Sequence, residues 1–178
     1  DALLIPLLAK GIGPGDAVLT TPFTYIATAE VISLVGAQPV FVDIYPQTLN
    51  IDPNRISKAI RNAKQKNLTP KAIISVDLFG LPARYRLLQK VAKENELFLI
   101  EDAAQSFGGK IRNIKCGKFG DVSSTSFFPA KPLGCYGDGG AIFTDDENLA
   151  ELMKSIRVHG SNGNDKYNNI RIGINGRL

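Results

Sequence analysis

The chain has 178 residues, 44% of them hydrophobic and 21% charged, which is enough to bury one core and is typical of a single globular domain. No apolar run is long enough to span a membrane, and the start does not resemble a signal peptide, so we expect neither membrane insertion nor secretion. The net charge of +4 comes from lysines and arginines spread over helix-like stretches, which indicates a solvated face rather than a nucleic-acid surface. A mildly basic protein could equally favour an anionic substrate.

Cysteine and histidine usage narrows the chemistry further. Cys116 and Cys135 are too few and too far apart for a zinc knuckle or a redox pair, and two free thiols fit a reducing cytoplasm. His159 is the single histidine, which argues against a His-rich metal site and against a Ser-His-Asp triad.

The first half of the chain predicts helices and strands in alternation. Residues 1–10 have a helical pattern that ends at Gly11, and Asp52-Pro53 begins a helix with a capping side chain and a proline at its first position. The other predicted elements are a strand at 17–20, a turn at 21–24, a helix at 25–35, a strand at 39–43, a helix from the 52–53 cap to about residue 62, and a strand at 71–76.

The second half continues the alternation. It predicts an amphipathic helix at 83–95, strands at 97–100 and 141–144, a helix at 146–157, and a loop rich in Gly, Asn and Asp at 159–169. Continuous apolar strands that alternate with helices predict an α/β fold, a mostly parallel sheet sandwiched by helices.

The segment from Glu101 to Gly140 carries the strongest chemical signal. Asp102 follows an apolar strand, at the sheet edge where α/β proteins bind ligands. Lys131 stands among Phe, Pro, Ala and Leu residues, and we expect such surroundings to disfavour the charged ammonium form, as a lysine that bonds covalently to a carbonyl carbon requires. Aspartate, glutamine, serine and lysine in this order suggest a pyridoxal phosphate (PLP) site.

These residues carry a resemblance to a known family. Asp102-Ala103-Ala104-Gln105, followed by Ser126 and by Lys131 five residues later, resembles the DegT/DnrJ/EryC1/StrS family of PLP-dependent sugar aminotransferases. The similarity runs through nearly the whole chain and implies the large domain of the type I aminotransferase fold. In that family a Gly-Thr pair that holds the cofactor phosphate comes just before the position of Asp1. Residues 1–178 therefore resemble a partial PLP-binding large domain from inside a longer protein, without its start and without the carboxyl-terminal small domain.

The resemblance implies a role for each of four residues. Lys131 would hold the cofactor covalently and, once released, move a proton as base and then as acid. Asp102 would pair with the pyridine nitrogen and keep it protonated. Gln105 would bond the cofactor ring oxygen or brace the ring, and Ser126 would donate its hydroxyl to the phosphate.

Three further residues are implicated by the same resemblance. Tyr25 matches an aromatic position that stacks on the pyridine ring. Asn175 and Arg177 match a segment that crosses the interface of a homodimer, the asparagine toward the neighbour's phosphate and the arginine toward substrate. No residue is expected to bind a metal.

Each feature also has an ordinary structural interpretation. A Glu-Asp pair after a strand is often a magnesium ligand set or a helix cap, a lysine beside prolines is usually a loop lysine, and Ser126 and Tyr25 could be a plain strand serine and a core tyrosine. Gly137-Asp138-Gly139-Gly140 lacks the context of a P-loop and more simply lets backbone pass close to the cofactor pocket. Only the combination and its spacing favour cofactor binding.

The function that the resemblance implies is amino transfer to a nucleotide-linked keto-sugar, with glutamate as donor, in cell-surface polysaccharide biosynthesis. The wording from Ser126 to Gly140 is closest to members that act on UDP-linked N-acetylated 3-oxo-hexuronic acids. Two alternatives remain: a non-catalytic truncated or regulatory protein of the same fold, and a cysteine desulfurase, against which the lack of a histidine directly before Lys131 argues. Relatives that dehydrate sugars have histidine in place of the lysine.

Overall fold

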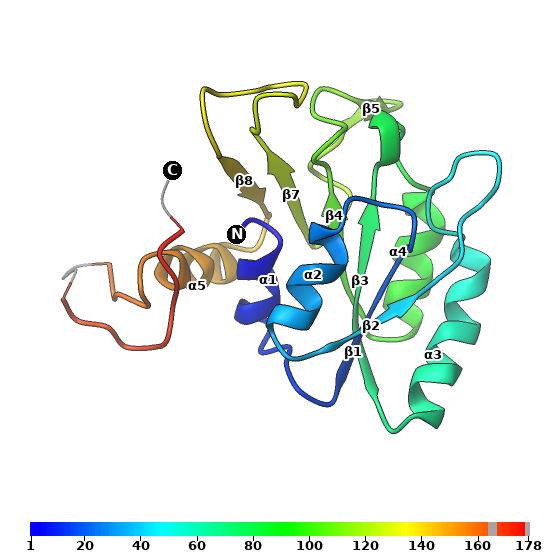
Figure 1. Cartoon of the computed structure of the whole chain (residues 1–178), viewed down its shortest axis with the longest axis horizontal. Helices are drawn as coiled ribbons and strands as arrows, with labels where there is room; N and C mark the ends of the chain where they lie inside the picture. The colour runs from blue at the N-terminus through cyan, green and yellow to red at the C-terminus, as the bar shows by residue number, and fades with distance from the viewer. Residues whose placement is uncertain (164–166, 177–178) are drawn as a thin grey trace.

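A six-stranded sheet forms the centre of the molecule in the computed structural model, which describes residues 1–163 and 167–176 (Figure 1). Its strand order is β2-β1-β3-β4-β7-β8, and all neighbours are parallel except β7 and β8. The strands are β1 (Asp16–Thr20), β2 (Gln38–Phe41), β3 (Thr69–Val76), β4 (Phe98–Asp102), β7 (Val122–Ser126) and β8 (Gly140–Phe143), and β5 (Lys110–Ile111) and β6 (Ile114–Lys115) form a separate hairpin.

Helices cover both faces of this sheet, as the sequence predicts. The α-helices are α1 (Leu4–Ala9), α2 (Ala27–Leu34), α3 (Ile56–Gln65), α4 (Tyr85–Glu94) and α5 (Glu147–Arg157), with short 3-10 helices η1 (Pro53–Arg55) and η2 (Leu78–Gly80). Figure 1 shows α3 and α4 on one side and α1, α2 and α5 on the other. The predicted α/β class with a mostly parallel sheet is confirmed.

The apolar periodicity of the chain explains this layering. In α3, Ile56, Ala59, Ile60 and Ala63 recur at the spacing of one helical face and are all buried. Ile56, Ala59 and Ile60 belong to a core beneath α3 and α4, while α1 and α2 pack on the other face through a second core that includes Leu7. A third cluster joins α5 to α1 and β7.

Strand β7 is the main element absent from the sequence prediction. Its sequence, Val-Ser-Ser-Thr-Ser, has a single apolar residue, yet its first four residues are buried. The three buried hydroxyls each have a partner: Ser123 donates to Glu101, Ser124 to the Ala2 carbonyl, and Thr125 to the Ala103 carbonyl. Hydrogen bonding of this kind allows polar side chains to be buried in a strand that apolar periodicity does not reveal.

The order of the strands reverses between the neighbouring strands β1 and β3. From β1 the chain crosses to β2 on one side, and from β2 it returns to β3 on the other side. Ligands of α/β proteins bind where the strand order reverses in this way, beyond the carboxyl ends of the strands. No helix within the described parts of the chain is long and apolar enough to cross a membrane.

Candidate active site

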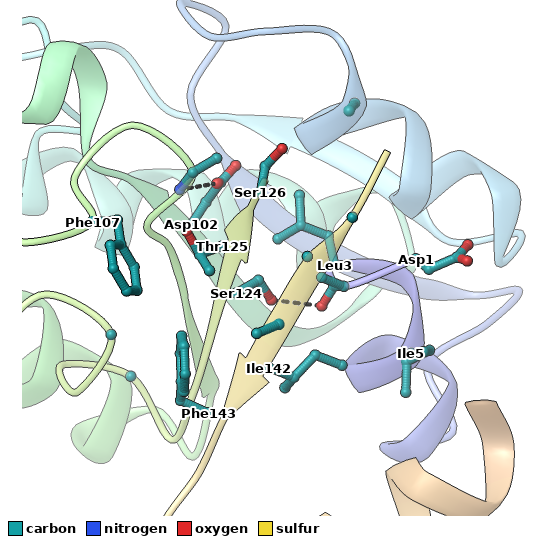
Figure 2. Close-up of a pocket in the computed structure, with 18 of the residues that line it drawn as sticks. Asp1, Leu3, Ile5, Asp102, Phe107, Ser124, Thr125, Ser126, Ile142 and Phe143 are labelled. Atoms are coloured by element: carbon teal, nitrogen blue, oxygen red, sulfur yellow. Dashed lines mark hydrogen bonds between the residues drawn. The ribbon is translucent and has the colours of Figure 1, made fainter. Parts of the chain in front are cut away.

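A cavity of about 1710 Å³ lies at the carboxyl ends of the central strands. Its wall includes the connection from β1 to α2, the end of β4, residues 124–126 of β7, and the loop between β7 and β8. Figure 2 shows Asp102, Phe107, Ser124 and Ser126 around this space, with the first residues of the chain on the opposite side. Five residues that the sequence singles out line this one cavity: Tyr25, Asp102, Gln105, Ser126 and Lys131.

Asp102 is the buried carboxyl of the cavity. It is 5% exposed and accepts hydrogen bonds from the Thr28 hydroxyl at 2.9 Å and from the Ala104 backbone N–H at 3.2 Å. Burial raises the pKa of Asp102 above its ordinary value, and the two hydrogen bonds and the charge of Lys131 oppose that rise. No ion pair within the described residues includes Asp102, so its ionised form would gain from a cationic partner in the cavity.

Lys131 lies in the loop between β7 and β8, on the wall of the same cavity. Its backbone N–H donates to the Phe128 carbonyl at 2.8 Å, which closes a tight turn. The expected apolar enclosure is not formed by its neighbours in sequence, because Phe128 is 51% and Leu133 49% exposed. Lys131 itself is half-buried and is one of the residues that line the cavity. Because the loop extends away from the core, Phe128 and Leu133 do not shield Lys131 from solvent. The expectation that these neighbours enclose the lysine was wrong.

Ser126 and Gln105 each have one hydrogen-bonding group engaged and another left over. The Ser126 Oγ accepts from the Phe128 backbone N–H at 3.2 Å, which leaves its O–H free to donate. The Gln105 Oε1 accepts from the Phe79 backbone N–H at 2.6 Å, which leaves the NH₂ group as the donor available to a ligand. Both residues therefore present donors to the cavity, as an anionic ligand would require.

Tyr25 precedes α2 at the rim of the cavity, where it is 70% exposed. The alternative of a core tyrosine is thereby wrong, and the ring is accessible to a flat ligand. Thr28 stands three residues later, on the helical face toward Asp102, and its hydroxyl bonds that carboxylate. Sequence reasoning missed Thr28, because its partner Asp102 lies 74 residues away in the sequence and no local pattern indicates the contact.

Asn175 and Arg177 are the two remaining residues that the sequence singles out. Asn175 forms an isolated antiparallel bridge with Val158, just after α5, and does not line the cavity. Arg177 lies outside the described residues.

Glycines Gly139 and Gly140 line the cavity, as the sequence interpretation of this turn expects. A Cβ on Gly140 would lie 2.6 Å from the Thr125 carbonyl oxygen, closer than real Cβ contacts allow. The glycine therefore permits the close pairing of β7 with β8 beside the cavity.

A second acidic cluster lies on the opposite face of the sheet. Asp77 accepts hydrogen bonds from the Tyr85 hydroxyl, the Ser106 hydroxyl and the Ala83 N–H, and burial raises the pKa of Asp77 to about 7. Glu101 accepts from Gly117 N–H, Phe119 N–H and the Ser123 hydroxyl. With Cys116 these carboxylates form the one group in the described ranges whose ligand atoms are close enough for a metal ion, all within 4.8 Å. The protein's own donors already occupy every carboxylate oxygen.

The opposed positions of Glu101 and Asp102 correct one interpretation of the sequence. Consecutive side chains of a strand point to opposite faces, so Glu101 faces α4 and Asp102 faces α2 and the cavity. The Glu-Asp pair cannot act together as a magnesium ligand set.

Comparisons with known proteins agree with this architecture. The profile of the DegT/DnrJ/EryC1/StrS aminotransferase family matches residues 1–178. A UDP-2-acetamido-2-deoxy-3-oxo-D-glucuronate aminotransferase from Pseudomonas aeruginosa is 48% identical over 100% of this chain and 47% of its own length. A protein from Geobacillus stearothermophilus named as a pleiotropic regulatory protein is also 48% identical, over 100% of this chain and 46% of its own.

A solved structure gives the same result in three dimensions. The crystal structure of a DegT DnrJ EryC1 StrS aminotransferase from Brucella abortus superposes with a TM-score of 0.96 at 56% identity, covering 99% of this chain and 48% of that one. The chain thus spans about half the length of the relatives it matches. Aminotransferases of this family depend on PLP. With its full-length match and its shared fold, the chain belongs to the DegT/DnrJ/EryC1/StrS aminotransferase family.

Proposed function

We propose that the complete protein is a PLP-dependent aminotransferase that converts a nucleotide-linked keto-sugar into an amino sugar. Residues 1–178 form part of its cofactor-binding large domain, and the rest of that domain and the small domain come from other parts of the protein. The observation that carries the proposal is the position of Asp102 and Lys131 on the wall of one cavity, the first buried and in no ion pair with another described residue, the second in reach of a ligand there.

The donors and acceptors of the cavity fit PLP. A protonated pyridine nitrogen is the cationic partner that the buried Asp102 carboxylate lacks. Ser126 and Gln105 have donors left for the anionic phosphate and the ring oxygen, and the exposed ring of Tyr25 suits stacking on a flat heterocycle. The cavity volume of about 1710 Å³ leaves room for a sugar nucleotide beside the cofactor.

The bound cofactor would supply an electron sink for the carbon that loses its proton. Lys131 would attach the cofactor and, when free, carry the proton between the donor carbon and the cofactor. Asp102, held by Thr28 and Ala104, would keep the ring nitrogen protonated. Asn175 of one subunit would reach the phosphate of the other in a homodimer, and Arg177 would approach the substrate.

We propose a UDP-linked 3-oxo sugar acid as the acceptor, glutamate as the amino donor, and the cytoplasm as the place of a step in cell-surface polysaccharide synthesis. The name of the P. aeruginosa relative, an aminotransferase of such a sugar, supports the acceptor. The G. stearothermophilus relative is named as a pleiotropic regulatory protein, so a regulatory, non-catalytic role is the alternative to test. Lys131 and Asp102 support catalysis, because together they would supply the covalent attachment, the proton carrier and the partner of the ring nitrogen that transamination requires.

The test is turnover by the complete gene product. Purified protein with PLP and glutamate is offered a UDP-linked 3-oxo sugar acid and, as comparison, a nucleotide 4-oxo-6-deoxy sugar, and amino sugars are detected by mass spectrometry. We expect amination of the 3-oxo substrate. Preference for the 4-oxo sugar would overturn the acceptor and leave the reaction standing, whereas PLP binding without turnover of any keto-sugar would favour the regulatory alternative.

A further inference from the structure

The loop after β4, which carries Gln105, is hydrogen-bonded to the segment that follows the neighbouring strand β3. The Gln105 Oε1 accepts from the Phe79 N–H at 2.6 Å, and the Ser106 Oγ donates to Asp77 Oδ2 at 2.7 Å. Thus two consecutive residues of the loop after β4 are bonded to the segment after β3. The backbones also approach closely, since a Cβ on Gly80 would lie 3.1 Å from the Gln105 carbonyl oxygen.

Phe79 has a conformation that its own side chain does not explain. Its φ of 56° and ψ of 23° place it in the left-handed region, which is unfavourable for a bulky residue. Its ring is 74% exposed and makes one edge contact, with Phe23 at 6.3 Å between centroids, so burial of the ring does not account for the strain. The backbone N–H of Phe79, by contrast, makes the short bond to Gln105.

The bond from Phe79 fixes the polarity of the Gln105 carboxamide. A backbone N–H can only donate, so the group it meets must be the amide oxygen, and the NH₂ group is left for the cavity. Without this partner the carboxamide could turn over and offer its oxygen to a ligand instead.

We propose that Phe79, Asp77 and Ser106 are positioning residues that hold Gln105 as a hydrogen-bond donor toward the ligand. Phe79 sets which end of the carboxamide faces the cavity, and the Asp77–Ser106 bond fixes the loop on which Gln105 stands. The other oxygen of Asp77, Oδ1, accepts from the Ala83 N–H, which holds the carboxyl group in place when the Tyr85 hydroxyl on the same oxygen is removed. The identity of the ligand, PLP with its anionic ring oxygen, rests on the proposed function.

A matched pair of variants separates positioning from general stability. Ser106→Ala and Tyr85→Phe each remove one buried hydroxyl that donates to Asp77 at 2.7 Å, but only Ser106 lies in the loop that carries Gln105. In the complete gene product we expect Ser106→Ala to raise the Kd for PLP about five- to tenfold, the effect of one weakened hydrogen bond, and Tyr85→Phe to leave it within about twofold. Equal changes in Kd for the two variants would overturn the role of Ser106.

Amide hydrogen exchange tests the same positioning without any cofactor. Ser106→Ala is expected to speed exchange in residues 77–81 and 103–109, and Tyr85→Phe to leave exchange in 103–109 unchanged. Unchanged exchange in Ser106→Ala would refute the link between the loops. If the parent protein binds no PLP at all, the proposed function is wrong. The hydrogen-exchange measurement would then still show whether Ser106 holds the loop that carries Gln105.

The polarity of Gln105 has its own test. Gln105→Glu keeps an oxygen for the Phe79 N–H but places a second, negatively charged oxygen where the NH₂ group was, whereas Gln105→Ala removes both ends. We expect Gln105→Glu to weaken PLP binding more than Gln105→Ala does. The glutamate carboxylate would repel the anionic ring oxygen of PLP, whereas alanine would only remove a hydrogen-bond donor from it. Binding by Gln105→Glu equal to that of the parent would show that Gln105 does not act as a donor.

Discussion

Two neighbouring carboxyl groups at the end of β4, Glu101 and Asp102, show what distinguishes a functional acid from a structural one. Both are buried, at 0% and 5% exposed, and they lie on opposite faces of the same strand. Glu101 accepts three hydrogen bonds from the chain itself, two of them from backbone N–H groups. Asp102 accepts one from Thr28 and one from Ala104, and it borders the cavity.

Burial alone therefore does not identify the functional acid. Glu101 holds residues 117–119 and β7 against this face of the sheet, where donors of the chain meet both of its carboxyl oxygens. Asp102 has capacity left for a ligand, and its pKa is raised because burial outweighs its few partners. The difference predicts that a change at Asp102 or at the cavity it borders alters chemistry, while a change at Glu101 alters stability.

The largest effect is expected at Lys131, on the cavity face. Lys131→Ala should lower transamination by the complete protein by about 10⁴-fold or more, since both the covalent attachment and the proton carrier are lost. Unfolding of the variant should match the parent, because Lys131 is half-buried in an exposed loop. Borohydride reduction followed by peptide mapping should place the pyridoxyl group of the parent on Lys131, and recovery of the label on another lysine would contradict the assignment.

Asp102→Asn should have the next largest effect. Loss of the carboxylate opposite the ring nitrogen should lower kcat by about 10²–10³-fold, the scale of one removed electrostatic partner. The shape of the residue is retained, and Asn can still accept from Thr28 and Ala104, so the PLP affinity should fall much less than kcat. A variant that transaminates at near the parental rate would show that Asp102 does not support the cofactor's electron withdrawal.

On the opposite face, Glu101→Gln tests the structural half of the comparison. The new NH₂ group would confront an N–H or O–H donor in a buried site, so we expect the free energy of unfolding to fall by roughly 2–3 kcal/mol. Denaturant titration measures the loss. In the fraction that folds, kcat should stay within about threefold of the parent, and a selective loss of kcat without loss of stability would place Glu101 in the chemistry.

The sequence predicts much of this fold because the strands from β1 to β4 are apolar and the helices strongly amphipathic. It does not predict β7, whose buried serines and threonine depend on partners such as Glu101 and Ala2 that are distant in sequence. The short β5–β6 hairpin has no apolar periodicity to reveal it.

The candidate site shows the same limit. Asp102, Gln105, Ser126 and Lys131 could be named because their order and spacing resemble a family motif, and the structure places all four on the wall of one cavity. Thr28 and Phe79 could not, because their contributions are single contacts across loops and helices, one from a hydroxyl and one from a backbone N–H. The residues next to Thr28 and Phe79 in the sequence give no indication of their partners Asp102 and Gln105.

The smallest effect is expected from Asp77, which shares the opposite face with Glu101. Burial, with a further contribution from the Glu101 charge, raises the pKa of Asp77 from 3.8 to about 7 in the folded protein. Between these values the folded state binds more protons than the unfolded state, so stability falls as the pH rises from about 4 to about 7, by at most about 1.4 kcal/mol per pH unit for this one group.

Asp77→Asn removes this titration. Thermal unfolding of the parent and of Asp77→Asn across pH 4–8 should give a flatter profile for the variant, while Tyr85→Phe, which keeps the carboxyl group, should retain a slope. The other titratable groups near Asp77 are Glu101, Tyr85 and Cys116. Burial raises the pKa of Cys116 to about 11 and raises the pKa of Tyr85 well above its ordinary value of 10.0, so neither changes charge in this window. An unchanged slope in Asp77→Asn would show that Asp77 is not the source of the pH dependence.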